Sequence, residues 1–128
     1  MKTMNLKLPA IVAAVLLCIQ AGLSAAEPAK EDAVLSAKLI SAIEKSDFAA
    51  FIADGEVPFQ QLKKEQFAAV AAQLSPLLQA KHEVSYLGEM KKHGYRVTLW
   101  RISFQSGGDD LLATLSVRDG RVGGFFLK

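Results

Sequence analysis

The sequence predicts an α+β fold in which three N-terminal helices pack on a four-stranded antiparallel meander sheet. In the first two thirds of the chain, apolar residues recur three and four positions apart, as in helices with one buried face. In the last third, β-branched and aromatic residues alternate with polar ones between short turn sequences, as in strands. With 128 residues, the chain has room for one such domain.

The first 26 residues have the order of a secretory signal peptide. Lys2 and Lys7 form a basic start, an apolar run covers positions 10–19, and Ser24-Ala25-Ala26 supplies small residues for cleavage after Ala26, or after Ala25 as the near alternative. The apolar run is shorter than the roughly 20 residues of a membrane-spanning helix. We therefore expect a secreted or periplasmic bacterial protein that is not held in a membrane once the signal is removed.

Cys18 raises the alternative of lipid attachment at the end of the signal. Val15-Leu16-Leu17 before it lack the small residues that a lipoprotein signal normally places there, so cleavage after Ala26 is preferred. The mature chain would then have no cysteine, and neither a disulfide nor a catalytic thiol. Losing Lys2 and Lys7 leaves 13 of the 15 basic residues against 13 acidic ones. A net charge near zero argues against a nucleic-acid partner.

Residues 27–32 are expected to form a flexible leader, and residues 33–128 the single domain. Helices are predicted over about 31–45, over a short segment with Asp47 as its N-cap, and over about 63–80, where Pro76 should kink or restart the last turn. Val57-Pro58-Phe59 is predicted to be a connector that is not helical, with Val57 and Phe59 in the core.

Strands are predicted over about 83–90, 95–105, 111–118 and 121–127. Asp119-Gly120 between two valines is a strong signal for a two-residue hairpin turn. Strict alternation would place Val122 and Phe126 on one face of the last strand, with Phe125 and Leu127 on the other. Gly123-Gly124 indicates a bulge or a close approach of the backbone to a neighbour, because no helix follows that could make it a phosphate loop.

Both faces of this sheet carry apolar side chains, and the helices can cover only one of them. An apolar second face must be buried against something, so we expect a homodimer that packs sheet to sheet. The sequence does not decide which face is the interface, and Trp100 or Leu99 would lie at its centre depending on the register. The candidate interface residues are Val97, Leu99, Trp100, Ile102 and Phe104.

This order of elements resembles the cystatin-like fold of the nuclear-transport-factor-two-like superfamily, and in particular its small secreted bacterial domains of unknown function. The resemblance rests on residues 86–88, on Trp100-Arg101-Ile102-Ser103-Phe104 and on residues 119–125, and it covers positions 33 to 128. It implies a curved sheet that forms a cone with the helices, and frequent dimerisation through the outer face. The candidate ligand-binding residues in that cone are Phe67, Val70, Leu74, Tyr86 and Trp100.

Enzymes of this superfamily commonly use an aspartate base, or an Asp–His pair, with a tyrosine donor in the cone. The residues available for that role here are Asp47 or Asp54 as base and Tyr86 or Tyr95 as donor, and they form no recognisable motif. His93 lies in a predicted turn, and His82 lies where it would favour the negative end of the preceding helix. Two histidines at opposite ends of one strand do not make a metal site by themselves. We expect neither a metal nor a cofactor.

The sequence therefore favours a secreted, dimeric binding or interaction domain that is not an enzyme and that holds a small apolar ligand between the third helix and the sheet. The competing hypothesis is a small isomerase or hydrolase that uses a carboxylate and a tyrosine in the cone. A buried carboxylate within hydrogen-bonding reach of a tyrosine or histidine would favour the enzyme.

Overall fold

A computed structural model describes residues 27–128. The predicted signal peptide and Cys18 lie outside the described residues, so their prediction stays untested. Within residues 27–128, no helix is long and apolar enough to cross a membrane.

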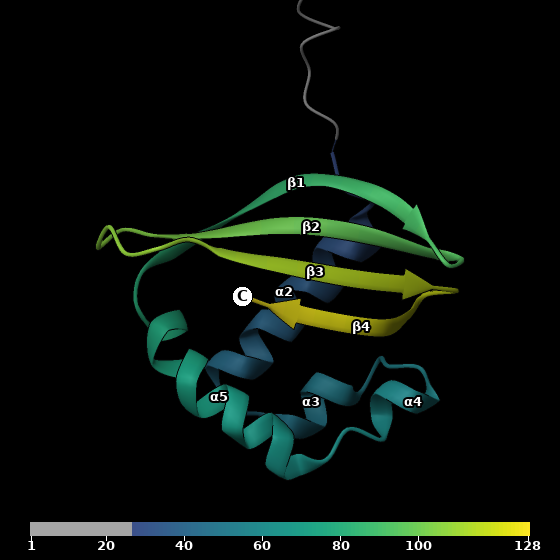
Figure 1. The fold of residues 1–128 in the computed structure, drawn as a ribbon, viewed down its shortest axis with the longest axis horizontal. Coiled ribbons are helices and arrows are strands. Elements are labelled where there is room, and N and C mark those ends of the chain that lie inside the picture. The colour runs from purple at the N-terminus through teal and green to yellow at the C-terminus, as the bar shows by residue number, and fades with distance from the viewer. Residues whose placement is uncertain (1–26) are drawn as a thin grey trace, which may run out of the picture.

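The described chain has the expected α+β fold. Four helices precede four strands, and the antiparallel strands follow one another across the sheet in the order β1-β2-β3-β4. In Figure 1, α2 runs diagonally behind the sheet, while α3, α4 and α5 lie beyond the edge formed by β4. This succession of helices and an antiparallel meander is the cystatin-like arrangement that the resemblance implied.

Helix α2 spans Lys30–Glu44, so part of the predicted flexible leader is helical. The prediction of a flexible leader was wrong for residues 30–32. The charge of Asp32 suggests an exposed side chain, but Asp32 is buried and anchors the start of α2. Its carboxylate is fully buried and accepts two hydrogen bonds from Arg96 on β2, at 2.7 and 2.8 Å. This bidentate pair fixes the start of α2 to the sheet.

Two short helices follow, and the second corrects the sequence prediction. Helix α3 spans Phe48–Ile52, with Asp47 as its N-cap as expected. The predicted connector forms the one-turn helix α4, Val57–Gln60, because Pro58 lies in its first turn, where a backbone N–H is not needed. Phe59 packs against the core as expected, but Val57 is 66% exposed and does not.

Helix α5 spans Lys64–Gln79 and continues through Pro76. It packs mainly on α2 and α3 and does not lie directly across the sheet. Ser75 Oγ donates a hydrogen bond of 2.6 Å to the carbonyl oxygen of Glu44, which joins α5 to the C-terminal end of α2.

The strands are β1 His82–Lys92, β2 Tyr95–Phe104, β3 Leu111–Arg118 and β4 Arg121–Leu127. The turn at Asp119-Gly120 has positive φ at both residues, 52° and 74°, as a two-residue hairpin turn with the twist of its strands requires. The register shifts after Ser116, and this bulge breaks the alternation predicted for β4. Val122 therefore joins Phe125 and Leu127 on the buried face, and Phe126 alone of these four points the other way.

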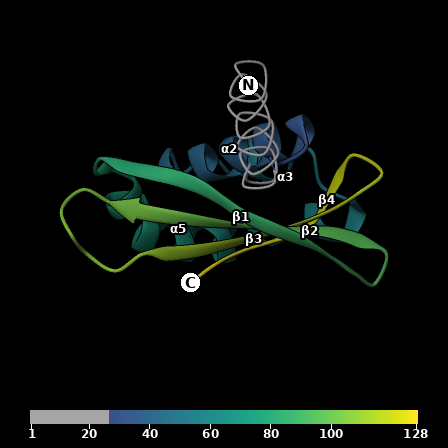
Figure 2. The same ribbon diagram turned by 90° about the horizontal axis from the view of Figure 1, so that it is seen from above.

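The strand register defines two faces of the sheet. Arg96 bonds to α2, so the face that contains Arg96 and every second residue after it in β2 is the inner face. Trp100 and Ile102 lie on this inner face and are buried in the core. Figure 2 shows α2 on one side of a strongly twisted sheet. The opposite, outer face carries Leu99 and, across the strands, Thr114 and Phe126.

Candidate functional site

The described residues form an apolar groove at the edge of β4, with a volume of about 570 Å³. We call it the β4 groove. One wall is the backbone and side chains of β4, and the other is built by α3, α4 and α5 together with Ile43 of α2. Its lining contains no acidic, basic or histidine side chain, and the polar side chains in it are two glutamines. The lining residues are Ile43, Phe51, Pro58, Phe59, Gln61, Leu62, Gln66, Phe67, Val70, Gly123, Gly124, Phe125, Phe126 and Leu127.

Aromatic contacts form the floor of the β4 groove. The ring of Phe51 lies 4.9 Å from that of Phe67, 5.3 Å from that of Phe59 and 6.2 Å from that of Phe125, measured between centroids. These four rings come from α3, α4, α5 and β4, so the floor exists only when all four elements are in place. Pairs at these separations and tilts stabilise each other beyond the area that they bury.

The wall that α4 provides is fixed to the sheet by the backbone just before it. Glu56 N–H donates to the carbonyl oxygen of Val122 at 2.8 Å, and Val122 N–H donates to that of Asp54 at 2.9 Å. A β-carbon on Gly55 would overlap the ring of Phe59, so glycine at this position lets α4 fold back closely. The segment therefore extends the sheet by one short parallel bridge and holds Phe59 over the groove.

The predicted ligand-binding residues divide between two places. Phe67 and Val70 line the β4 groove, and Leu74 packs against the core beside it. Trp100 lies elsewhere, against α2, with Tyr86 next to it at 5.2 Å between ring centroids. The sequence placed all five residues in one cone, but α2 fills the space between the sheet and α5, so the structure does not bring them together.

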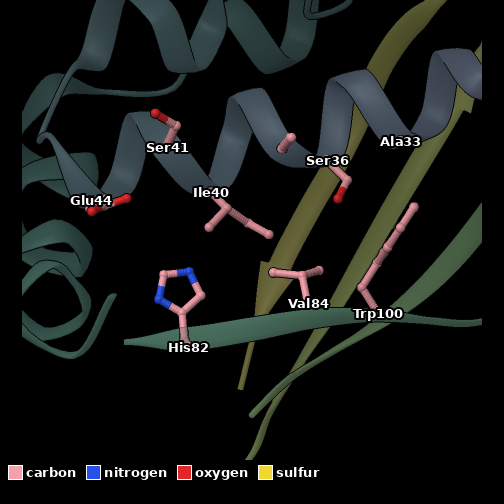
Figure 3. A pocket seen from close by; sticks show the side chains of 9 residues that line it. Ala33, Ser36, Ile40, Ser41, Glu44, His82, Val84 and Trp100 are labelled. Carbon is pink, nitrogen blue, oxygen red and sulfur yellow. The ribbon is translucent and has the colours of Figure 1, made fainter. Parts of the chain in front are cut away.

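Trp100 instead lines a smaller hollow of about 320 Å³ between α2 and the inner face of β1, which we call the α2–β1 cleft. Figure 3 shows its side chains, which project from one stripe of α2 and from the facing strands. Unlike the β4 groove, this cleft is partly polar. Its lining residues are Ala33, Ser36, Ala37, Ile40, Ser41, Glu44, His82, Val84 and Trp100.

The residues proposed for acid–base catalysis do not form a site. Asp47 accepts a hydrogen bond from the N–H of Ala50 as the cap of α3 and is exposed. Asp54 forms an exposed ion pair with Lys38 at 2.6 Å. Neither carboxylate has a tyrosine or histidine among its hydrogen-bond partners in the described chain.

Tyr95 does bond a carboxylate, but at the rim of the sheet and not in a cone. Its hydroxyl donates to Glu56 at 2.7 Å, and Arg118 donates to the same carboxylate at 3.1 Å while its guanidinium lies 4.3 Å from the centre of the Tyr95 ring. The hydrogen bond from Tyr95, followed by Arg118, lowers the pKa of Glu56. The same bond raises the pKa of Tyr95. Such a carboxylate is a poor base, so this cluster is structural.

The tyrosine ring also accounts for one glycine of the predicted bulge. A β-carbon on Gly123 would overlap the ring of Tyr95. The close backbone approach expected at Gly123-Gly124 is therefore confirmed, and its cause is that Tyr95 crosses the sheet to reach Glu56.

Tyr86, the other proposed donor, lies on the inner face of β1 and is partly buried. Partial burial and the nearby negative charge of Glu89 raise its pKa. The fully buried Asp32 is engaged by Arg96, whose pKa is raised by that hydrogen bond. A buried carboxylate is thus present, but its hydrogen-bond partner is an arginine and not the tyrosine or histidine that would favour an enzyme.

The two histidines lie where the sequence placed them. His93 is exposed in the β1–β2 turn, with a positive φ of 53°. His82 is the first residue of β1, just beyond α5, and its Nδ1 lies 2.8 Å from the carbonyl oxygen of Ala80. In residues 27–128, no three His, Cys, Asp or Glu side chains lie close enough to hold a metal ion.

The candidate interface residues fall on opposite faces. Trp100 and Ile102 are core residues of the inner face, and Phe104 packs against the same core. They are therefore not available to an interface on the outer face. Val97 and Leu99 lie on the outer face, where Val97 is buried, so of Leu99 and Trp100 only Leu99 lies on this face.

Sequence reasoning missed most of the β4 groove, including Phe51, Phe59 and Phe125. Each was recognised as apolar, but they come from three separate segments, and no local pattern shows that they converge. It also missed Glu44 and His82 as neighbours across the α2–β1 cleft. Their approach depends on the angle between α2 and β1, which the sequence does not display.

Comparisons with known proteins show a likeness of fold only. No protein-family model matches the chain, and no curated protein matches it. A solved structure described as an uncharacterized cystatin fold protein from Novosphingobium aromaticivorans is similar, with 12% sequence identity and a TM-score of 0.40. The match covers 73% of this chain and 94% of that one.

Proposed function

We propose that this protein is a binding domain without catalytic activity that holds a small apolar ligand in the β4 groove. The observation that carries the proposal is the composition of the groove: about 570 Å³ lined by aromatic and aliphatic side chains, with no ionisable group. Hollows of this volume and character are typical of small-molecule sites. A site without an acid, a base or a nucleophile favours binding over chemistry.

The ligand would be uncharged or largely apolar. A charged group in the groove would lose its water without gaining an opposite charge, which costs free energy. Gln61 and Gln66 at the lining can offer hydrogen bonds to one polar end of the ligand. The backbone of β4 at Gly123 and Gly124 lies in the same wall and adds further polar groups.

The test is a titration with N-phenyl-1-naphthylamine, an uncharged probe that fluoresces in apolar surroundings. We expect saturable binding to one site. Val70 lines the groove and is 47% exposed, so Val70→Glu should preserve the fold and weaken probe binding at least tenfold. Val34→Glu is the matched control on the exposed surface of α2, where Val34 is 58% exposed and outside the groove, and it should bind like the wild type. Absence of saturable binding, or equal binding by both variants, would contradict the proposal.

A second proposal is dimerisation through the outer face of the sheet. It is supported by the apolar side chains of that face, where Phe126 is 68% exposed beside the partly exposed Leu99 and Leu112. Patches of this kind mark interaction surfaces. Sedimentation velocity at micromolar concentration should show a dimer that Leu99→Arg converts to a monomer, and a monomeric wild type would exclude it.

We also propose that the protein is exported, on the strength of the signal-like order of residues 1–26. Fractionation of a bacterial host that expresses the full chain should place the protein outside the cytoplasm. N-terminal sequencing of that material should begin at Glu27. Retention in the cytoplasm with Met1 intact would contradict this.

A further inference from the structure

We propose that the α2–β1 cleft is a second binding site, which takes a small ammonium compound with an apolar body. The cleft is lined by side chains that share one stripe of α2 and by two strands that face it (Figure 3). This inference does not depend on the β4 groove, since the two hollows have no lining residue in common.

The stripe of α2 leaves room because its residues are small. Ala33, Ser36, Ala37 and Ser41 lie on the side of the helix that faces β1. At the other wall, β1 is an edge strand, so one of its sides has no neighbouring strand. Val84 on its inner face is 38% exposed, which shows that α2 does not cover β1 completely.

Apolar surface forms the base of the cleft. Ile40 and Trp100 are buried, and in Figure 3 Val84 lies between His82 and Trp100 while Ile40 projects toward them from α2. The indole N–H of Trp100 donates to Thr98 Oγ1 at 2.9 Å, so that polar group is already satisfied. What Trp100 offers a ligand is therefore its apolar surface and the negative face of its ring.

The polar end of the cleft accepts hydrogen bonds. His82 Nδ1 lies 2.8 Å from the carbonyl oxygen of Ala80, and because a carbonyl only accepts, Nδ1 is the donor of this hydrogen bond in the tautomer that the proposed site uses. Nε2 then carries a lone pair, and Figure 3 shows this edge of the ring pointing toward α2. Glu44 lies on the facing end of α2 and supplies a carboxylate.

The charge at this end is negative and has no cation paired with it. Glu44 is the last residue of α2, where the carbonyl end of the helix is itself negative, and the last turn contains no basic residue. Within residues 27–128, Glu44 takes part in no ion pair within 4.0 Å. Lys45 follows it and is exposed. A carboxylate at a helix C-terminus is unfavourable for the helix, and a bound cation would relieve that repulsion.

These features select the ligand class. An ammonium group is positively charged and donates hydrogen bonds, so it matches the carboxylate of Glu44 and the lone pair of His82 Nε2. Its hydrocarbon part would contact Ile40, Val84 and Trp100. The volume of about 320 Å³ lies at the lower end of small-molecule sites, so the ligand is a small amine.

The experiment is an NMR titration of the ¹⁵N-labelled protein with benzylammonium chloride, with benzyl alcohol as the uncharged match. The chain has one tryptophan, so its indole N–H gives a single resonance inside the cleft. We expect saturable shifts of that resonance and of the amides of Glu44, His82 and Val84. The affinity for benzylammonium should exceed that for benzyl alcohol about tenfold, because a charge-assisted hydrogen bond is lost with the alcohol.

Two variants and a control complete the test. Glu44→Gln should weaken benzylammonium binding about tenfold and leave benzyl alcohol unchanged. Ala37→Leu adds bulk at an exposed lining position and should abolish binding of both probes, which keeps the proposal testable if Glu44→Gln does not fold. Glu65→Gln, the same change at an exposed position of α5, should have no effect. Equal affinity for the two probes, shifts that map to the β4 groove, or unchanged binding by Glu44→Gln or Ala37→Leu would overturn the proposal.

Discussion

The two hollows of this domain both use α2 as a wall, yet they differ in chemistry. The β4 groove meets the side of α2 that carries Ile43, and its lining contains five phenylalanines and no charged side chain. The α2–β1 cleft meets the side that carries Ser36 and Glu44 and adds a histidine. One helix thus separates an apolar site from a polar one. The groove is closed by three further helices, whereas the cleft is closed by the edge strand β1 and by Trp100 of β2.

The comparison predicts that a substitution at the base of the β4 groove lowers the free energy of unfolding more than one at the rim of the α2–β1 cleft. Phe67 is 4% exposed and packs on Phe51, so Phe67→Ala should lower the free energy of unfolding by about 3–4 kcal/mol. Val84 is 38% exposed, and Val84→Ala should cost less than about 1 kcal/mol. Urea denaturation measures both. Equal losses would show that the two hollows are built alike.

Helix α2, the wall that both hollows share, is attached to the sheet by the pair of Asp32 and Arg96, and a substitution can break this attachment. The side chain of Asp32 is 1% exposed and that of its partner Arg96 is 35% exposed. Asp32→Asn removes the negative charge that pairs with Arg96, and water can solvate part of the guanidinium that is left. We expect a loss of about 2 kcal/mol in the free energy of unfolding. Asp54→Asn disrupts the exposed pair with Lys38 and should change it by no more than about 0.5 kcal/mol. A similar small effect for both variants would mean that the contact between α2 and the sheet does not depend on Asp32.

The smallest expected change in stability concerns the cluster of Tyr95, Glu56 and Arg118, which lies beside the α4 wall of the β4 groove. Because the pKa of Glu56 is lowered in the folded protein, its ionised carboxylate stabilises the fold above pH 4.5, the ordinary value. This stabilisation is lost as the pH falls through the lowered pKa. The raised pKa of Tyr95 means that its contribution is present below its ordinary value of 10.0 and is lost as the pH rises through the raised value. Tyr95→Phe should therefore be slightly less stable at neutral pH.

The difference in stability between wild type and Tyr95→Phe should shrink at both ends of the pH range. Denaturation measured from about pH 2 to about pH 12 covers both losses, since one lies below the ordinary pKa of Glu56 and the other above that of Tyr95. His93→Gln, an exposed change in the β1–β2 turn, serves as a control that should not alter the profile. A difference that is independent of pH would show that the hydroxyl of Tyr95 does not interact with the ionised Glu56.

The sequence by itself determined the element types, the strand order and the hairpin turn at Asp119-Gly120. These follow from local spacing and from glycine chemistry, because a period of 3.6 or 2 and a positive φ are properties of adjacent residues. The resemblance to cystatin-like domains added the expectation of a curved sheet that forms a cone with the helices. Local patterns failed at Pro58, which is acceptable in a first helical turn, and at Val122, where a bulge reverses the alternation.

Only the tertiary structure decided where the two hollows lie and what lines them. Asp32 looks like a solvent-exposed charge at the start of a helix, and its burial is explained by Arg96, 64 positions away. Tyr95 reaches Glu56 across the sheet through a hydrogen bond, and Glu44 and His82 line the same cleft from α2 and β1. No local spacing encodes either arrangement. Such sites depend on the angles and register at which distant segments pack. These are set by the shapes of many side chains together, and the sequence pattern of any one segment does not contain them.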